Sequence, residues 1–217
     1  MTERGIELCW DCRAGLSVIS MPLCDCCGEA VHGRIDHAYV CQTCSTTPPF
    51  YRRSRAAVHY NVLGKRLVTQ FKYSHALWLE RLLVDLLESC VHAHYGGERY
   101  DAVCAVPLHA VKRRERGFNQ SQLLAKALAR RLNLPVVNSR QMKRTRMTPS
   151  QTRLTARQRL TNVMGAFEAK PAERWSGKQL LLVDDVMTTG ATVSACAKAL
   201  KDAGAGSVDV VTVARGI

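Results

Sequence analysis

Short runs of consecutive apolar residues alternate along most of the chain with stretches whose apolar positions recur every three or four residues. A continuous apolar run is typical of a strand buried on both faces of a parallel sheet, and the longer spacing is typical of a helix with one buried side. The runs predict strands over residues 56–60, 100–107, 134–137, 179–185 and 207–214. The longer spacing predicts helices over residues 61–73, 76–94, 119–132 and 191–204. The pattern therefore indicates an α/β fold, in which helices flank a parallel sheet.

The first 50 residues follow a different pattern. Seven of the ten cysteines lie between residues 9 and 44, and this region carries six acidic residues against three arginines. The segment STTPPF (Ser45–Phe50) then places two prolines together, which disfavours helix and strand alike. We therefore expect a small cysteine-rich domain over residues 1–50 and an α/β domain over residues 51–217.

The net charge of +13 is concentrated after residue 50, because the first 50 residues contribute 3 − 6 = −3 and the remainder +16. The densest part, residues 112–159, holds fourteen lysines and arginines and a single acidic residue, Glu115. Such an excess is either a solvated face or a surface that receives polyphosphate or a nucleic-acid backbone. Charge alone leaves both interpretations open.

No apolar stretch approaches the 18 residues that a membrane-spanning helix needs. The first residues carry acidic groups and cysteines instead of a basic segment followed by an apolar one. We expect a protein without membrane insertion, located in the cytoplasm.

The clustered cysteines form three pairs with metal-ligand spacing, CWDC, CDCCG and CQTC. A Cys-x-x-Cys turn presents two thiolates, and two such turns complete a tetrahedral zinc site without a large core. Ribbon-like spacing favours zinc at Cys24, Cys27, Cys41 and Cys44, and Gly28 can adopt the positive φ that such a turn tends to need.

The other cysteines of this region have no clear place in that site. Cys9 and Cys12 lack a partner pair, so they could replace one of the other pairs or belong to a degenerate second site, and Cys26 is left over. A disulfide cluster is disfavoured because cytosolic thiols stay reduced. Cys90, Cys104 and Cys196 stand alone among apolar residues and are expected in the core.

Two acidic residues and a small-residue loop follow the apolar strand at residues 180–183, in the sequence LLLVDDVMTTGAT. Ligands of open parallel sheets bind where a strand ends and the next helix begins. Free N–H groups and threonine hydroxyls suit a phosphate there, and Asp184 and Asp185 can accept hydrogen bonds from the vicinal hydroxyls of a sugar. The combination predicts a ribose 5-phosphate site, with the phosphate held by Val186, Met187, Thr188, Thr189, Gly190, Ala191 and Thr192.

This stretch resembles the 5-phosphoribosyl 1-diphosphate (PRPP) loop of type I phosphoribosyltransferases. Two further segments, VPLHAVKRRERGFNQSQLLA (106–125) and KRTRMTPSQTRLTARQRLTNVMGAF (143–167), resemble signature regions of the ComF/GntX family, in which cysteine-rich zinc ribbons precede such a domain. With the cysteine pairs, the resemblance covers nearly the whole chain. Many family members carry four cysteine pairs, whereas this chain has three, which puts a second zinc in doubt.

The resemblance implies a type I phosphoribosyltransferase fold, a glycosyltransferase activity that uses PRPP and Mg²⁺, and a catalytic role for Asp184 and Asp185. It also implies that a segment around residues 143–146 closes over the site. The acceptor of the phosphoribosyl group cannot be inferred from these motifs. The pyrophosphate would be bound by Pro107, Leu108, Arg113, Arg116, Lys143 and Arg144.

The family is associated with competence and the use of external DNA, which implies a role in DNA uptake and a competence helicase as a partner. An alternative from another functional class stays open: a non-catalytic protein that binds single-stranded DNA or a partner protein and keeps the PRPP pocket as a sensor or relic. The basic region suits a DNA backbone, although only Phe118 and Phe167 flank it as aromatic residues for base stacking.

Overall fold

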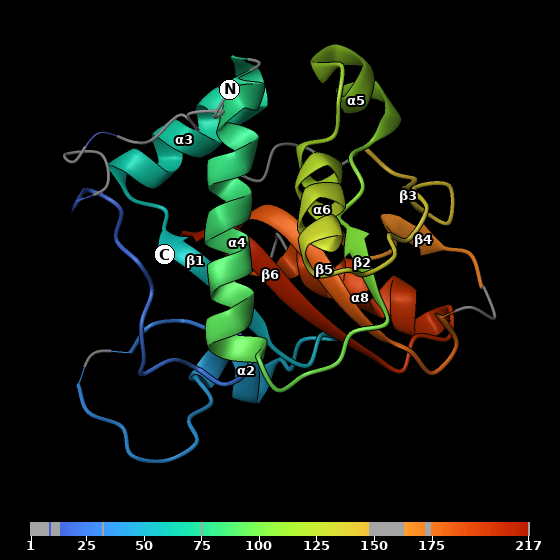
Figure 1. The fold of residues 1–217 in the computed structure, drawn as a ribbon. Helices are drawn as coiled ribbons and strands as arrows, with labels where there is room; N and C mark the ends of the chain where they lie inside the picture. The colour runs from blue at the N-terminus through green and yellow to red at the C-terminus, as the bar shows by residue number, and fades with distance from the viewer. Residues whose placement is uncertain are drawn as a thin grey trace.

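A four-stranded parallel sheet forms the centre of the molecule in the computed structural model (Figure 1). The structure describes residue 9 and residues 14–31, 33–74, 76–147, 163–171 and 175–216. The strands lie side by side in the order β1-β6-β5-β2, and every neighbouring pair is parallel. Their bounds are β1 (Ser54–His59), β2 (Ala102–Ala105), β5 (Gln179–Met187) and β6 (Ser207–Arg215).

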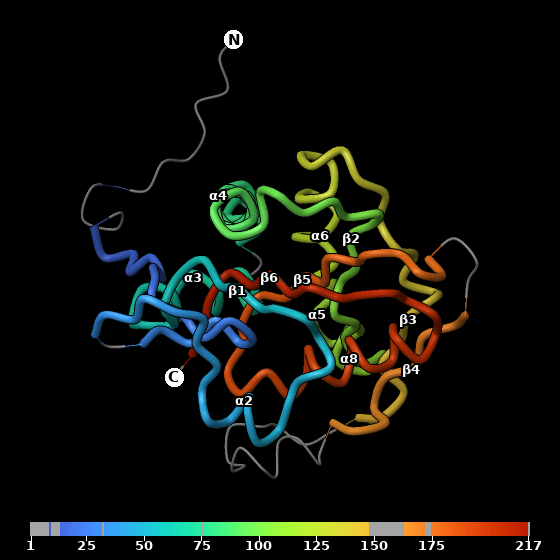
Figure 2. The backbone as a smooth tube through the Cα atoms, turned by 90° about the horizontal axis from the view of Figure 1, so that it is seen from below, coloured from blue at the N-terminus to red at the C-terminus, as the bar shows by residue number. Residues whose placement is uncertain are grey.

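Helices cover both faces of this sheet, as the view along its edge shows (Figure 2). One face carries α3 (Val62–Tyr73), α4 (Glu80–Tyr95) and α6 (Gln120–Arg131), and the other carries α8 (Ala191–Asp202). Successive residues of β5 point to opposite faces, so Leu180 and Leu182 pack toward α8 while Leu181 and Val183 pack toward the other helices. Burial on both faces explains the unbroken apolar run and confirms the predicted α/β sheet.

The ends of the predicted helices agree closely with the structure. The side-chain oxygen of Asn61 accepts a hydrogen bond from the backbone N–H of Gly64 (3.0 Å), so it caps α3 at the start of the predicted helix. Gly204, with φ of +107°, follows the end of α8. The helix predicted over 76–94 instead begins as a 3₁₀ turn, η1 (Leu77–Leu79), and continues as α4.

Several short elements differ from the prediction. The strand expected over 134–137 is reduced to one bridge between Val103 and Val136. A short helix, α5 (Ala110–Arg116), follows β2, and a two-stranded antiparallel hairpin pairs β3 (Met142–Arg144) with β4 (Phe167–Ala169). Residues 134–137 are apolar, but Pro135 has no N–H to donate to a strand ladder. The new elements are short, and α5 and β3 are highly charged, so they carry no hydrophobic period that a sequence pattern could reveal.

The cysteine-rich segment packs against β1 and the C-terminal ends of the sheet, and its short helix is α2 (Gln42–Thr46). Gly28 has φ of +68°, and a Cβ there would lie 2.4 Å from the carbonyl oxygen of Ser54, so only glycine allows the turn to approach β1 this closely. The buried guanidinium of Arg55 donates to the carbonyl oxygen of Asp25 (3.1 Å). Among the described helices, none is long and apolar enough to cross a membrane.

Candidate functional site

Two buried carboxylates lie near the end of β5 and are held by different helices. Asp184 and Asp185 are only 7% and 3% exposed. The hydroxyl of Ser121, in the first turn of α6, donates to Oδ1 of Asp184 (2.7 Å). The ammonium of Lys72, near the end of α3, lies 2.9 Å from Oδ2 of Asp185. Three elements that are distant in sequence therefore meet at the predicted carboxylate pair.

Burial gives this pair unusual electrostatics. Loss of water, followed by repulsion from Asp185, raises the pKa of Asp184 to about 7, while Ser121 and Lys72 act in the opposite direction. Burial opposes the charge on Lys72, but the neighbouring carboxylates outweigh it and raise the pKa of Lys72. Lys72 therefore stays charged, and Asp184 changes its charge close to neutral pH.

The predicted phosphate loop surrounds a small cavity of about 70 Å³ at the start of α8. The turn begins later than predicted, because Val186 and Met187 continue β5 and only Thr188 to Gly190 connect it to α8. Gly190 has φ of +76°, a conformation that strongly favours glycine. Asp184 and all seven residues predicted for the phosphate line this cavity together with Val193: Val186, Met187, Thr188, Thr189, Gly190, Ala191 and Thr192.

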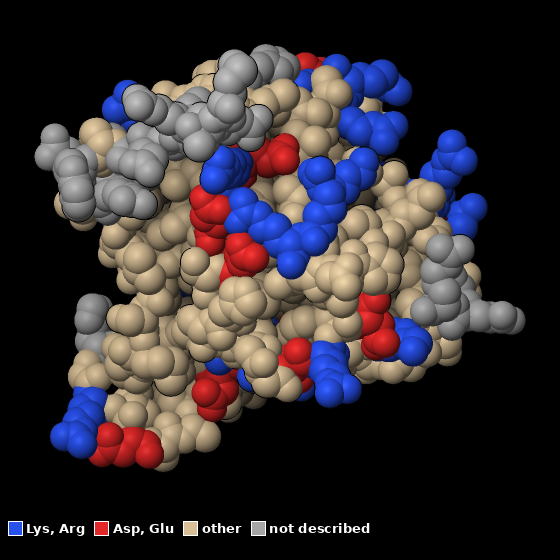
Figure 3. All heavy atoms as spheres, viewed as in Figure 1, with Lys and Arg blue, Asp and Glu red and all other residues tan. Residues whose placement is uncertain are grey.

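A larger, basic cavity of about 740 Å³ lies between the edge strand β2 and the β3/β4 hairpin. Arg113, Arg140 and Lys170 line it, and no carboxylate does so among the described residues. Five of the six residues predicted for pyrophosphate binding also line this cavity: Pro107, Leu108, Arg113, Lys143 and Arg144. Basic side chains gather over the upper part of the face that Figure 3 shows, around α5.

The sixth predicted residue, Arg116, lies elsewhere. Its guanidinium stacks on the ring of Tyr73 at 4.8 Å and donates to the side-chain oxygen of Gln120. Arg116 is therefore placed beside the end of α3, the helix that carries Lys72, and outside the lining of the basic cavity.

Contacts in the structure explain several residues of the segment RGFNQS (116–121). The side chain of Asn119 caps α6 by accepting from the N–H of Ser121 (3.1 Å), and it donates to the carbonyl oxygen of Val106 just after β2 (3.1 Å). The ring of Phe118 packs edge-on against Phe71 at 6.1 Å. These contacts place Ser121 where its hydroxyl reaches Asp184.

The segment predicted to close over the site is partly regular structure. Lys143 and Arg144 belong to β3, where backbone pairing with β4 holds them, and the Lys143 ammonium lies 3.1 Å from Glu168. Burial lowers the pKa of Arg144, with Cys196 and Asp184 acting against this effect. Residues 148–162 of the family-like segment 143–167, among them Gln151, Leu154, Arg159 and Asn162, lie outside the described residues.

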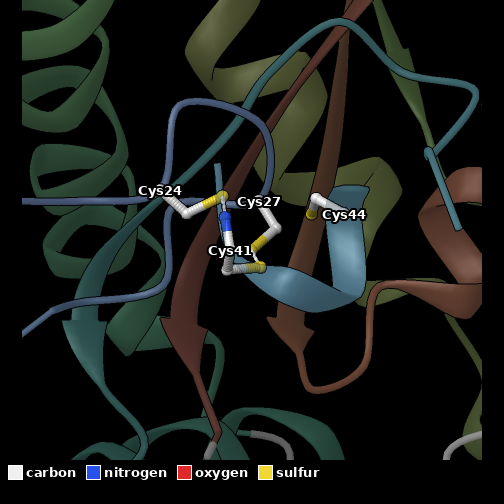
Figure 4. Close-up of side chains that lie close together, drawn as sticks. All are labelled: Cys24, Cys27, Cys41 and Cys44. Carbon is white, nitrogen blue, oxygen red and sulfur yellow. Dashed lines mark hydrogen bonds between the residues drawn. The ribbon is translucent and has the colours of Figure 1, made fainter. Parts of the chain in front are cut away.

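Four buried cysteines gather as predicted, and Figure 4 shows their side chains converging from the cysteine-rich turns and from α2. The Sγ atoms of Cys24, Cys27, Cys41 and Cys44 all lie within 4.8 Å of one another. The Cys27 and Cys41 sulfurs are 3.8 Å apart, close to the edge of about 3.8 Å expected for a tetrahedron with metal–sulfur bonds of about 2.3 Å. The cluster can hold a metal ion and is consistent with a zinc ribbon.

The four thiols do not have the same acidity. Burial raises the pKa of Cys27 to about 12 and that of Cys44 still further, whereas at Cys24 burial is outweighed by hydrogen bonds from backbone N–H groups, which lower the pKa to about 7. Arg215, at the end of β6, donates to the Cys27 carbonyl oxygen (2.7 Å) and lies 3.4 Å from the Cys27 sulfur. This arginine links the cluster to the sheet.

The cysteines outside the cluster include three in the core and one that is exposed. Cys90, Cys104 and Cys196 are buried in the core, as predicted. Cys9 is exposed and stands apart from the four clustered cysteines, and Cys12 lies outside the described residues.

Sequence reasoning missed both side chains that hold the carboxylates. Ser121 lies inside a segment that resembles the family signature, so it could have been singled out there. Lys72 belongs to a helix whose apolar spacing indicates only which side is buried. No local pattern relates it to Asp185, which lies over a hundred positions later in the chain.

Comparison with known proteins defines the class of the second half of the chain. A family model described as the phosphoribosyl transferase domain matches residues 119–217. This segment begins at the cap of α6 and includes Ser121, β5, the loop, α8 and β6. The chain therefore contains a phosphoribosyl transferase domain, built as a parallel sheet flanked by helices.

Relatives extend the match to nearly the entire chain. DNA utilization protein YhgH of Escherichia coli (strain K12) is 35% identical over 228 residues, which cover 96% of each chain. Competence protein F of Haemophilus influenzae is 30% identical over 212 residues, 96% of this chain and 90% of the relative. A solved adenine phosphoribosyltransferase from Saccharomyces cerevisiae covers 63% of this chain and 68% of its own, with a TM-score of 0.43 and 16% identity. The two sequence relatives show that the chain belongs to the ComF/GntX family.

Proposed function

We propose that the chain binds PRPP with Mg²⁺ at the end of β5 and acts in the uptake or use of external DNA. The observation that carries this proposal is a buried carboxylate pair near the end of β5, of which Asp184 lines the cavity formed by the loop before α8. A separate cavity lined by cations offers the second anion site. The family membership and the names of the relatives support the DNA process.

In this proposal each part of PRPP has its own partners. The 5-phosphate accepts hydrogen bonds from the N–H groups at the start of α8 and from threonine hydroxyls. Asp184 and Asp185 bind the ribose hydroxyls, and Mg²⁺ accompanies the pyrophosphate, as is usual for this hard cation. The cations of the 740 Å³ cavity offset the negative charge that develops on the leaving pyrophosphate. The chain would then be a phosphoribosyltransferase whose acceptor is unknown.

The same proposal divides the chain into a zinc ribbon over residues 1–50 and a phosphoribosyltransferase-like domain over residues 51–217, in a cytoplasmic protein. Zinc is bound by Cys24, Cys27, Cys41 and Cys44, because four buried sulfurs within 4.8 Å of one another suit this metal. Zinc would supply folding energy and not chemistry, since all four positions are taken by protein ligands.

Calorimetry of PRPP with Mg²⁺ tests the site. Binding is expected for the intact chain and not for the Asp184→Asn/Asp185→Asn double variant. Asp202→Asn is the matched control, because this aspartate is exposed at the other end of α8, where it pairs with Lys198. No binding by the intact, zinc-loaded chain would contradict the proposal.

Catalysis needs a separate measurement. Release of pyrophosphate should be followed with mixtures of nucleobases and amines as acceptors, and activity should disappear in the same aspartate variant. Binding of PRPP without turnover with any acceptor would favour the second candidate below.

The second candidate is a non-catalytic protein that binds single-stranded DNA or a partner such as a competence helicase and senses PRPP. The basic surface around α5 favours it. Binding of a labelled oligonucleotide should weaken steeply with salt, because each neutralised phosphate releases counterions. Undetectable association at low salt with zinc-loaded protein would remove this candidate.

A further inference from the structure

A third cavity, of about 530 Å³, lies on the other side of residues 188–191 of the phosphate loop, which line both this cavity and the phosphate cavity. We call it the Phe50 pocket. Neither Asp184 nor Asp185 lines it. Its walls come from the cysteine-rich segment, the proline-containing linker, the first turns of α8 and the end of β6. Its volume is in the range that binds small organic ligands, and such sites commonly form where separate parts of a chain meet.

The linker gives this pocket a flat apolar wall. Phe50 and Tyr51 follow two prolines, and all four residues line the cavity. The backbone N–H of Phe50 donates to the Ser194 hydroxyl of α8 (3.1 Å), which holds the linker in place. Tyr51 is buried, whereas 40% of Phe50 is exposed. An aromatic ring that is held at a cavity and left partly in water suits stacking with a planar ligand.

Polar groups line one side of the same pocket. Glu29 offers a carboxylate, and Thr43 and Thr47 offer hydroxyls. The Arg215 guanidinium lies 3.9 Å from the Glu29 carboxylate and is otherwise held by Cys27. A ligand with ring N–H or amino groups would find acceptors here, while its flat faces contact the linker.

One cation stands beside the aromatic wall, because the Lys198 ammonium lies 5.5 Å from the centre of the Phe50 ring and also pairs with Asp202. A second cation, the Arg146 guanidinium, donates to the carbonyl oxygen of Met164, a residue of the pocket lining (2.9 Å). The described lining itself offers a surface for stacking and hydrogen-bond acceptors, and these two features suit a nucleobase.

We propose that the Phe50 pocket binds a nucleobase, supplied either by a free nucleotide or by a single-stranded DNA. The pocket shares Thr188 to Ala191 with the phosphate loop, and a Cβ on Gly190 would lie 3.0 Å from the Tyr51 hydroxyl. A base in the pocket therefore contacts the wall of the phosphate cavity. Base binding itself does not depend on PRPP binding, and only a linkage between the two ligands would rest on the proposed function.

The test measures binding of deoxyadenosine 5′-monophosphate, thymidine 5′-monophosphate and a twelve-nucleotide oligothymidylate to the zinc-loaded full chain. Ribose 5-phosphate is the probe without a base. Phe50→Ala should weaken nucleotide or oligonucleotide binding at least tenfold, because loss of one base–aromatic stack typically has an effect of about this size. Ribose 5-phosphate binding should be unchanged in this variant.

Two further variants keep the test decisive. Thr47→Trp fills the pocket from an exposed lining position and should block base binding without disturbing the core. Trp78→Ala removes an exposed aromatic elsewhere and should have no effect. Asp184→Asn/Asp185→Asn should abolish PRPP binding and leave base binding intact, so the two proposals can fail separately.

The probes also distinguish the two sources of the base. Binding of the oligonucleotide alone would support a DNA base as the ligand, and binding of the mononucleotides would show that a free nucleotide is sufficient. The proposal is overturned if no base-containing probe binds, or if Phe50→Ala and Thr47→Trp bind the probes as the unmodified chain does.

Discussion

The ammonium of Lys72 lies 2.9 Å from Oδ2 of Asp185 and thereby joins the end of α3 to the end of β5. Their side chains are only 19% and 4% exposed. A buried carboxylate requires such a partner, because desolvation disfavours its charge. Lys72 is thus the cationic partner of a carboxylate that the proposed ribose site uses.

Lys72→Met should destabilise the fold, because it leaves the Asp185 carboxylate buried without its cation. We expect a loss of about 3 kcal/mol in the free energy of unfolding, measured by urea denaturation at pH 7.5. Adding Asp185→Asn to Lys72→Met should recover most of this loss, since no unpaired charge remains. Equal instability in the single and double variants would show that Lys72 acts through packing alone.

PRPP affinity should rise with pH through neutrality. The pKa of Asp184 is raised to about 7, so its ionised fraction grows from roughly a tenth at pH 6 to nine-tenths at pH 8. The ribose hydroxyls and the nearby Mg²⁺ bind the ionised Asp184 carboxylate better than the protonated one. Calorimetry should therefore show that PRPP affinity increases about tenfold over this range.

Ser121→Ala provides the control for this pH effect. The Ser121 hydroxyl bonds to Asp184 and lowers the pKa of that carboxyl, so its removal should move the affinity profile to higher pH. Titration of the ligand phosphates is the same for both proteins. Superimposable profiles would mean that Asp184 does not govern the pH dependence.

The stability of the fold should change with pH in the opposite direction, because of the same Asp184 carboxyl. The pKa of Asp184 is raised above its ordinary value of 3.8, so the folded chain binds a proton that the unfolded chain releases. This contribution to stability is fully present at low pH and is lost as pH rises from about 4 to about 7. Asp184→Asn should therefore gain stability relative to the unmodified chain at pH 8 and not at pH 4, as measured by denaturation at both values.

Gly190→Ala should weaken PRPP binding by more than tenfold. Positive φ alone costs an alanine roughly 1 kcal/mol, and its Cβ would also lie 3.0 Å from the Tyr51 hydroxyl and 3.1 Å from the Met187 methyl carbon. Gly177→Ala is the matched control, because Gly177 has φ of +69° and nothing within 4 Å of its Cβ position. The control should lose stability only. Similar PRPP affinities in both variants would argue against a binding role for the loop.

Removal of zinc should destabilise the chain through the cysteine cluster. Elemental analysis should find one zinc per chain at the cluster, and Cys44→Ser should lose it, whereas Cys26→Ser should retain it because Cys26 is outside the four clustered cysteines. A loss of about 3 kcal/mol would lower Tm by roughly 6–12 °C. Retention of zinc by Cys44→Ser would exclude the proposed ligand set.

Much of the sheet could be predicted because its strands are buried on both faces. The run Leu180 to Val183 is apolar throughout and fully buried, and the loop after it lies where parallel sheets bind ligands. The cysteine cluster could also be predicted, because the geometry of each Cys-x-x-Cys turn is local and two such turns need only one metal ion between them. The cap at Asn61 was local for the same reason.

The short charged elements could not be predicted, because their positions depend on packing. Lys143 and Arg144 form a strand only because β4 pairs with them, and Val186 and Met187 extend β5 because β6 continues alongside. Arg116 differs from Arg113, which precedes it on the same short helix, since Arg116 stacks on Tyr73 whereas Arg113 lines the basic cavity.

The sequence by itself determined the four strands of the central sheet and the long helices around them, the acidic strand end with its glycine-containing loop, and the four sulfurs, because each depends on residues that are close together in the chain. Only the tertiary structure decided that Lys72 and Ser121 hold the two carboxylates, and that the linker, the cysteine turns and α8 enclose the Phe50 pocket. Those contacts join residues that no local period relates, so the packing of the whole chain determines them.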